Sequence, residues 1–176
     1  MDPQRFAIAK DKVLGSENKE SGIGTLGERS LHRILKYYYE PMEQRHEIPI
    51  GRYVADIVNE DGIIEIQTGN FNTIRKKLSD FLTVGRVTLV FPVAQTKYLV
   101  WADPESGTLR PPRKSPRKGS VYDIIPELYK IKNFLQDQNL HFRIVLLCID
   151  EYRYLNGWSG DKKRGSSRFE RIPSSF

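Results

Sequence analysis

The 176-residue sequence has a single cysteine, Cys148, no long apolar run, and no apolar segment of the signal-peptide kind near its start. A membrane helix needs about 20 consecutive apolar residues. One cysteine cannot form an internal disulfide, and this favours a reducing compartment. Cys148 lies in the apolar run 144–149, so we interpret it as a small buried side chain. These absences predict a cytoplasmic protein with no contact to a membrane.

Two common kinds of binding motif are missing as well. His32, His46 and His141 are isolated and lack the Cys/His spacing of a zinc site. We interpret His32 as a partly buried helical histidine rather than a catalytic base. The glycines of residues 22–27 follow no predicted strand and have no Gly-Lys-Ser/Thr ending, which argues against a nucleotide-binding loop.

Positive charge is abundant. Lys and Arg number 28 against 22 Asp and Glu, giving a net charge of +6, which would attract a polyanion such as DNA. One basic cluster contains Arg113, Lys114, Arg117 and Lys118, and a second spans residues 162–171. Proline, serine and glycine surround both clusters and favour exposed loops. Each cluster is either a solvated loop or a phosphate-binding segment.

Hydrophobic periodicity predicts alternating helices and strands. Helices are expected from about Thr25 to just before Pro41, from Asn70 to about Leu82, and from about Val121 to Gln138. Strands are expected at 46–50, 53–58, 63–67, 87–93, 97–101 and 142–149. The order predicts an α/β fold with a central mixed β-sheet flanked by helices. Residues 1–24 are interpreted as a flexible lead-in, 25–157 as one domain, and 158–176 as a basic tail or linker that continues further or orders on a partner.

Two acids interrupt apolar strands. Asp56 lies within Val54–Val58, and Glu65 lies within Ile63–Ile66. Burying two carboxylates is costly unless a cation compensates, and neither strand contains a lysine or arginine. Mg²⁺ or Mn²⁺ would suit these hard oxygen ligands. The side-chain carbonyl of Gln67, or the backbone carbonyl of Ile66, could supply a further ligand.

Glu28 borders the inward face of the first predicted helix. It forms a capping-box pattern with Thr25, in which the carboxylate satisfies a backbone amide. An alternative role is an outer metal ligand or an orienter of metal-bound water. The two roles are compatible.

Glu28 on a leading helix, then Asp56, then Glu65-Ile66-Gln67 across a turn and a following helix, resembles the PD-(D/E)XK nuclease superfamily. The similar span runs from about Gly22 to Val93. The resemblance implies a restriction endonuclease-like core in which Asp56 and Glu65 bind one or two metal ions. The third motif residue is usually a lysine that positions the attacking water. Gln67 stands in its place, as it does in some restriction endonucleases.

The resemblance implies a Mg²⁺-dependent DNA endonuclease, either restriction-type or structure-selective in the manner of Holliday junction resolvases, with a role in DNA repair or recombination. Double-stranded or branched DNA would be the substrate, and a homodimer is plausible if both strands are cut, although no interface is encoded in the sequence. Arg52 could contact a phosphate. Lys76 or Lys77 could restore the missing positive charge, although a solvated helix face also explains both lysines.

Two other interpretations stay open. The absent motif lysine and the basic tail favour a catalytically inactive nucleic-acid-binding module that retains the nuclease fold. Alternatively, the chain is an unrelated α/β domain in which the acids pair with Arg52 or Lys76. Loss of cleavage on replacing Glu65 by alanine would support the nuclease.

Overall fold

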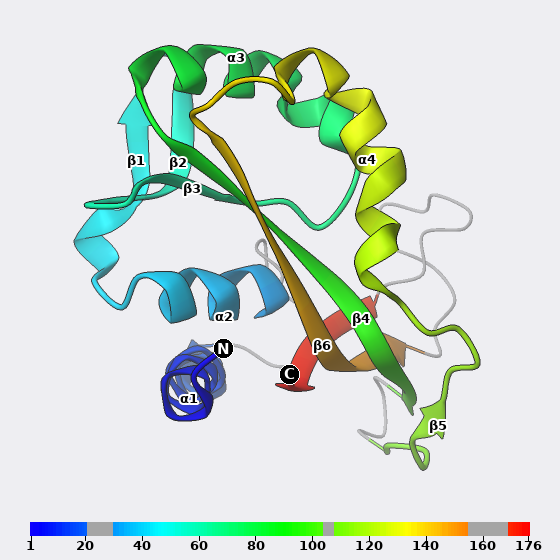
Figure 1. Ribbon diagram of the computed structural model, residues 1–176. Coiled ribbons are helices and arrows are strands. Elements are labelled where there is room, and N and C mark those ends of the chain that lie inside the picture. Colours follow the sequence, from blue (N-terminus) through cyan, green and yellow to red (C-terminus); the bar gives the residue numbers. More distant parts are fainter. Residues whose placement is uncertain (21–29, 104–107, 155–168) are drawn as a thin grey trace, which may run out of the picture.

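A mixed β-sheet with helices on both faces forms the centre of the protein. The computed structural model describes residues 1–20, 30–103, 108–154 and 169–176. The sheet has seven strands in the order β1-β2-β3-β4-β6-β7, with β5 paired to β4. Figure 1 shows helices above and below this sheet. The predicted fold class, α/β with a central mixed sheet flanked by helices, is confirmed. None of the described helices is long and apolar enough to span a membrane.

The strand pairs at the two edges of the sheet are antiparallel, and those in the middle are parallel. β1–β2, β2–β3 and β6–β7 pair antiparallel, whereas β3–β4 and β4–β6 pair parallel. The strand bounds are β1 His46–Ile50, β2 Tyr53–Asn59, β3 Gly62–Ile66, β4 Val87–Ala102, β5 Arg113–Lys114, β6 Leu140–Tyr154 and β7 Phe169–Ser175.

Helices α2 (Ser30–Tyr39) and α3 (Arg75–Val84) cover opposite faces of the sheet, with α1 (Pro3–Glu20) packed against α2 as a further layer. α4 (Ile125–Lys130) is on the α3 side. Four short 3₁₀ turns complete the order: η1 Glu43–Arg45, η2 Phe71–Ile74, η3 Val121–Ile124 and η4 Lys132–Phe134.

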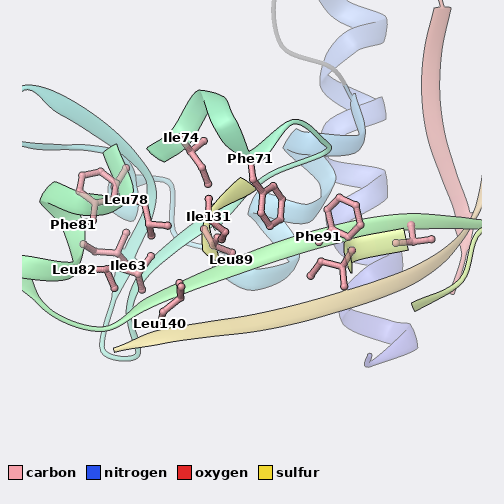
Figure 2. Packing of buried hydrophobic residues seen from close by; sticks show 14 residues of the cluster. Ile63, Phe71, Ile74, Leu78, Phe81, Leu82, Leu89, Phe91, Ile131 and Leu140 are labelled. Carbon is pink, nitrogen blue, oxygen red and sulfur yellow. The ribbon is translucent and has the colours of Figure 1, made fainter. Parts of the chain in front are cut away.

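Each face of the sheet carries its own hydrophobic core. On the α3 face, Phe71 packs edge-on against Phe91 at 5.5 Å between ring centres. Figure 2 shows this cluster drawn from β3, β4, α3 and β6, with Ile63, Leu78, Phe81 and Leu89 among its members. On the α2 face the buried residues come from α1, α2, β2, β3, β4 and β6. Both cores pack against the sheet, and they position the β2 and β3 residues that carry the acidic side chains.

A tight turn joins β2 to β3. Gly62, the first residue of β3, follows this turn directly and has a φ of +105°, a conformation that glycine tolerates and other residues avoid. A Cβ at this position would lie 2.5 Å from the carbonyl oxygen of Arg86, so the chain can pass here only without a side chain. The turn sets the register that pairs Ile57 with Ile64.

The bounds of several predicted elements differ in the structure, and three of them differ most. The strands expected at 87–93 and 97–101 form one 16-residue strand, β4, with a bulge between Ala94 and Thr96. The helix expected from Val121 to Gln138 was wrong in length, because α4 ends at Lys130 and is followed by turns. The helix is capped at Ile131, whose backbone has left the helical conformation (φ −116°, ψ 24°) and whose amide donates to the Leu128 carbonyl at 3.0 Å.

Both ends of the chain contain regular structure where none was expected. The lead-in predicted for residues 1–24 contains α1, whose first turn is capped by the Asp2 carboxylate accepting from the Gln4 amide at 2.8 Å. Its buried stripe is narrow: among residues 3–15, the part of α1 whose side chains the structure describes, the buried residues are Phe6, Ala9 and Val13. The tail predicted for 158–176 contains β7, which pairs antiparallel with β6.

Candidate active site

Asp56 and Glu65 lie opposite each other where β2 and β3 separate. The ladder pairs Ile57 with Ile64, and the two acids are the next residues along each strand. Each carboxylate accepts a hydrogen bond from the other strand: the Ile66 amide donates to Asp56 at 2.8 Å, and the Asp56 amide donates to Glu65 at 2.9 Å. The side chains thus replace the ladder bonds that are missing where the strands part, and both acids are held in fixed positions.

The two carboxylates differ in their affinity for protons. Burial and the nearby negative charge of Asp56 raise the pKa of Glu65 to about 7, against the lowering effect of Lys77. Burial would also raise the pKa of Asp56, but hydrogen bonds from His32 and the Ile66 amide, with the charge of Lys77, hold that pKa below its ordinary value. Asp56 is therefore the ionised member of the pair at neutral pH, and Glu65 is poised to lose its proton when more positive charge arrives.

Lys77 supplies a cation to the site from α3. Its Nζ lies 2.5 Å from Oε2 of Glu65, and its side chain is only 20% exposed. Lys76, the neighbouring candidate, is exposed. The helical spacing carried a signal for this difference, because Lys77 lies three residues after Ile74 and four before Phe81, both of which are buried.

His32 reaches the site from α2, on the opposite face of the sheet from Lys77. Its Nε2 lies 3.2 Å from Oδ2 of Asp56. The sequence indicated a partly buried helical histidine, and the side chain is indeed 24% exposed. The contact with Asp56 was not foreseen, because sequence spacing cannot say which strand a helix crosses. His32 thus contacts Asp56 from one face of the sheet, and Lys77 contacts Glu65 from the other.

Gln67 directs its amide away from the acids. Its Nε2 donates to the carbonyl oxygen of Gly69 and contacts Oγ1 of Thr73 at 3.3 Å, both in the loop that leads into α3. Its backbone amide donates to the Val90 carbonyl at 2.9 Å. This arrangement ties the end of β3 to the following loop. Whether Gln67 orients a water stays a prediction, as does a ligand role for the Ile66 carbonyl.

The donor set is compatible with a magnesium ion. Among residues 1–20, 30–103, 108–154 and 169–176, no three His, Cys, Asp or Glu side chains are close enough together to form a metal site. Mg²⁺ does not need three, because it keeps several waters and is commonly bound by one or two carboxylates together with substrate phosphates. Asp56 and Glu65 provide such a pair, and the raised pKa of Glu65 reflects negative charge that a cation would offset.

The residues predicted to contact DNA occupy several parts of the surface. Arg52 is exposed and pairs with Asp80 of α3 at 3.2 Å, and Lys76 is exposed on the same helix. The remaining four are exposed and distant along the chain from the acids: Arg113, Lys114, Arg117 and Lys118. β5, which contains the first two, pairs with Tyr98 and Leu99 of β4. Leu89 of β4 is the residue paired with Glu65. At ~3.3 Å per residue, the stretch of β4 that pairs with β5 therefore lies roughly 30 Å along the strand from Leu89.

Glu28, with its capping partner Thr25, lies outside the described residues, and so does most of the second basic cluster, residues 162–168. The described site therefore consists of Asp56, Glu65, Lys77 and His32.

The chain is similar to a protein family and to a protein of another organism, and the description of neither names an activity. A family described as "Domain of unknown function (DUF8091)" matches residues 29–176. An "Uncharacterized protein" of Treponema pallidum (strain Nichols) is 31% identical over 150 residues, which are 85% of this chain and 57% of that protein. The chain thus spans little more than half of this relative's length. No solved structure matches the chain.

Proposed function

The chain belongs to the DUF8091 family, and we propose that it is a metal-dependent endonuclease that hydrolyses phosphodiester bonds in DNA. The observation that carries the proposal is the buried pair Asp56 and Glu65, opposite each other on parting strands with Lys77 against Glu65. The proposal includes a restriction endonuclease-like core of the PD-(D/E)XK kind, Mg²⁺ or Mn²⁺ as cofactor, and double-stranded or branched DNA as substrate.

Placement of the acids supports a functional role more than a structural one. Two carboxylates buried side by side cost free energy, and replacing such groups by apolar residues is often neutral or stabilising. Glu65 is 5% exposed, and its raised pKa reflects this unfavourable setting. Binding of a cation between the two carboxylates would offset the free energy lost by burying them, and it would give the pair a functional role. When bound, Mg²⁺ would lower the pKa of a water molecule and neutralise charge on the scissile phosphate.

The protein side chains would divide the remaining work. Asp56, ionised at neutral pH, and Glu65 would hold the metal. Lys77 would take the place of the lysine that Gln67 replaces, offering positive charge to the phosphate or orienting the attacking water. His32 would keep Asp56 ionised and fixed through its contact at 3.2 Å. The proposed cytoplasmic location follows from the single cysteine.

One observation favours a second candidate, a nucleic-acid-binding module without catalysis. The Gln67 amide is engaged by its own loop at Gly69 and Thr73 rather than by the acids. Lys77 and Glu65 could then be an ion pair that holds α3 against β3. In that case the fold would bind DNA and leave it intact.

A cleavage assay separates the two candidates. Labelled duplex, branched and single-stranded DNA are incubated with Mg²⁺, Mn²⁺ or EDTA, using wild type, Glu65→Gln and Glu40→Gln. Glu40 is a matched control, because it is similarly buried at 4% exposed but pairs with Arg45 outside the site. The nuclease predicts metal-dependent cutting that Glu65→Gln abolishes and Glu40→Gln preserves. Uncut DNA in every metal condition, with binding retained, would support the silent module.

A further inference from the structure

Three cations converge on one buried carboxylate at the far end of the sheet from Asp56 and Glu65. Glu151 of β6 accepts hydrogen bonds from Arg153 at 2.7 Å, from Lys97 of β4 at 3.1 Å, and from Arg171 of β7 at 3.1 Å. The Glu151 side chain is 2% exposed. Burial would raise the pKa of Glu151, but these three partners lower it to about 2. We call these four residues the Glu151 cluster.

The positive charge of the Glu151 cluster exceeds the negative charge of its one carboxylate. Three cations against one carboxylate leave a charge of +2. Among the acids of the described parts of β6 and β7, Asp150 and Glu170 do not offset it, because strand alternation puts both on the other face of the sheet, beside Tyr152. Burial, together with these two carboxylates, raises the pKa of Tyr152. A buried ion pair needs one cation per acid, so the surplus requires another explanation.

The cations are held in place but remain accessible. The Arg153 guanidinium lies 5.6 Å from the centre of the Trp101 ring, and that of Arg171 lies 4.7 Å from the centre of Phe169. Each guanidinium has five donors, of which Glu151 takes two from Arg153 and one from Arg171. Arg153 and Arg171 keep 34% and 29% of their side-chain surface exposed. Donors fixed in this way suit an anion with several oxygens.

β5 extends the same charged face. Arg113 is in register with Leu99, which is in register with Glu151, and Glu151 is in register with Arg171. Registered partners project their side chains from one face, so Arg113 joins the row that contains the Glu151 cluster. Figure 1 shows β4 and β6 as two long ribbons that run from the β3 region down to β5. The cationic row crosses the far end of these ribbons.

We propose that the Glu151 cluster, with Arg113, is a second phosphate-binding site that holds the nucleic-acid backbone at a distance from the carboxylate pair. The separation of roughly 30 Å along β4 corresponds to about nine base pairs at ~3.4 Å each. Glu151 acts as the fixed centre that orients the cations, and Trp101 and Phe169 keep the guanidiniums spread. This inference rests on the proposed function for the identity of the polyanion, and it does not require cleavage.

The proposal is tested by measuring the binding of a labelled duplex of about 30 base pairs, which is roughly 100 Å long at ~3.4 Å per pair. The measurement uses the Glu65→Gln protein in EDTA, so that no DNA is cut. The Arg153→Gln/Arg171→Gln double variant should reduce the slope of log affinity against log salt by about two, because each arginine neutralises one phosphate. The Arg153→Lys/Arg171→Lys variant keeps the charge and should keep the slope. Arg45→Gln is the control, because Arg45 is an ion-paired arginine of matched exposure, 31%, near the β1 end of the sheet.

The Arg Nε–H resonances of Arg153 and Arg171 in the Glu65→Gln protein provide a readout that does not depend on folding of the double variant. Addition of the duplex should shift both resonances, and Arg45 should stay unchanged. An unchanged salt slope in a folded double variant, or unmoved resonances under a bound duplex, would overturn the proposal while leaving the nuclease untouched. Saturation by inorganic phosphate alone, with no response to DNA, would assign the site to a free phosphate and overturn the nucleic-acid assignment. Failure of the chain to bind DNA at all would count against the proposed function as well.

Discussion

Lys77 of α3 lies with its Nζ 2.5 Å from Oε2 of Glu65, so the helix that follows β3 places a cation against the buried acid of that strand. Gln67, the residue directly after β3, donates its side-chain amide to the Gly69 carbonyl in the segment before α3. The positive charge missing from the strand is thus available from the next helix. Because Lys77 is largely buried and Lys76 is exposed, the two adjacent lysines form a matched pair for mutation.

Lys77→Ala should reduce the rate of DNA cleavage by about 10²-fold, as expected for loss of one fixed group that stabilises developing charge. Lys76→Ala removes the same charge from an exposed position and should change the rate by no more than about twofold. Lys77→Arg retains the cation and should recover part of the rate. Single-turnover cleavage rates with Mg²⁺ measure all three. Equal rates for Lys77→Ala and wild type would remove Lys77 from the mechanism.

His32→Ala should raise the pKa of Asp56, because the hydrogen bond and charge of His32 help to lower it. Asp56 must be ionised to bind a metal, so the acid limb of the pH–rate profile should move to higher pH. His141→Ala removes a histidine from β6, away from Asp56, and should leave the profile in place. Cleavage rates across the pH range test this. A uniform fall in rate without a shift would mean that His32 supports the fold rather than the charge of Asp56.

Gly62→Ala should destabilise the protein by about 2 to 4 kcal/mol, because it combines an unfavourable positive φ with a clash. Its Cβ would lie 2.5 Å from the Arg86 carbonyl oxygen, and backbone cannot move aside as a flexible side chain could. Gly15→Ala in α1 meets no atom within 4 Å and should stabilise by about 0.5 to 1 kcal/mol. Chemical denaturation of both variants gives the comparison. A neutral Gly62→Ala would show that the β2–β3 turn adapts, and the fixed register of the two acids would then be in doubt.

Periodicity in the sequence predicted the central strands and α3 well, because those segments alternate or repeat strongly around buried residues. It failed at α1, whose buried stripe of Phe6, Ala9 and Val13 is too narrow to stand out among charged neighbours. It also failed at β7, which carries Arg171 and Glu170 and pairs with β6, from which 14 residues separate it in the sequence. Pairing between distant segments leaves no local pattern.

The acids of the site were predictable, whereas their partners were predictable only in part. Asp56 and Glu65 stand out as charges in apolar strands, and the turn before Gly62 fixes them opposite each other. Lys77 was one of two candidate lysines, and helical spacing favoured it over Lys76. The contact of His32 with Asp56 depends on how α2 crosses the sheet, which no local spacing specifies. The Glu151 cluster was missed for the same reason, because Lys97, Arg153 and Arg171 come from three different strands.

The stability of the metal-free protein should fall as pH rises from about 5 to about 7. Glu65 has a pKa of about 7 in the folded protein against an ordinary value of 4.5, so the folded state retains a proton that the unfolded state has already released. The decrease should be on the order of 2 to 3 kcal/mol and complete above pH 7, since each pKa unit is worth about 1.4 kcal/mol. Glu65→Gln should abolish this pH dependence.

Glu40 affects stability in the opposite direction. Burial raises the pKa of Glu40, but hydrogen bonds from the Met42 amide, Asn59 and Arg45 lower that pKa overall. The ionised Glu40 therefore stabilises the folded protein at neutral pH, and Glu40→Gln should remove a stabilisation that wild type loses only as pH falls. At the proposed metal site, Mg²⁺ would compete with the proton on Glu65, so a stabilising effect of Mg²⁺ should be present above pH 7 and absent near pH 5. Thermal denaturation in EDTA and in Mg²⁺ measures both effects, and a Mg²⁺ effect that persists in Glu65→Gln would assign the metal to a different site.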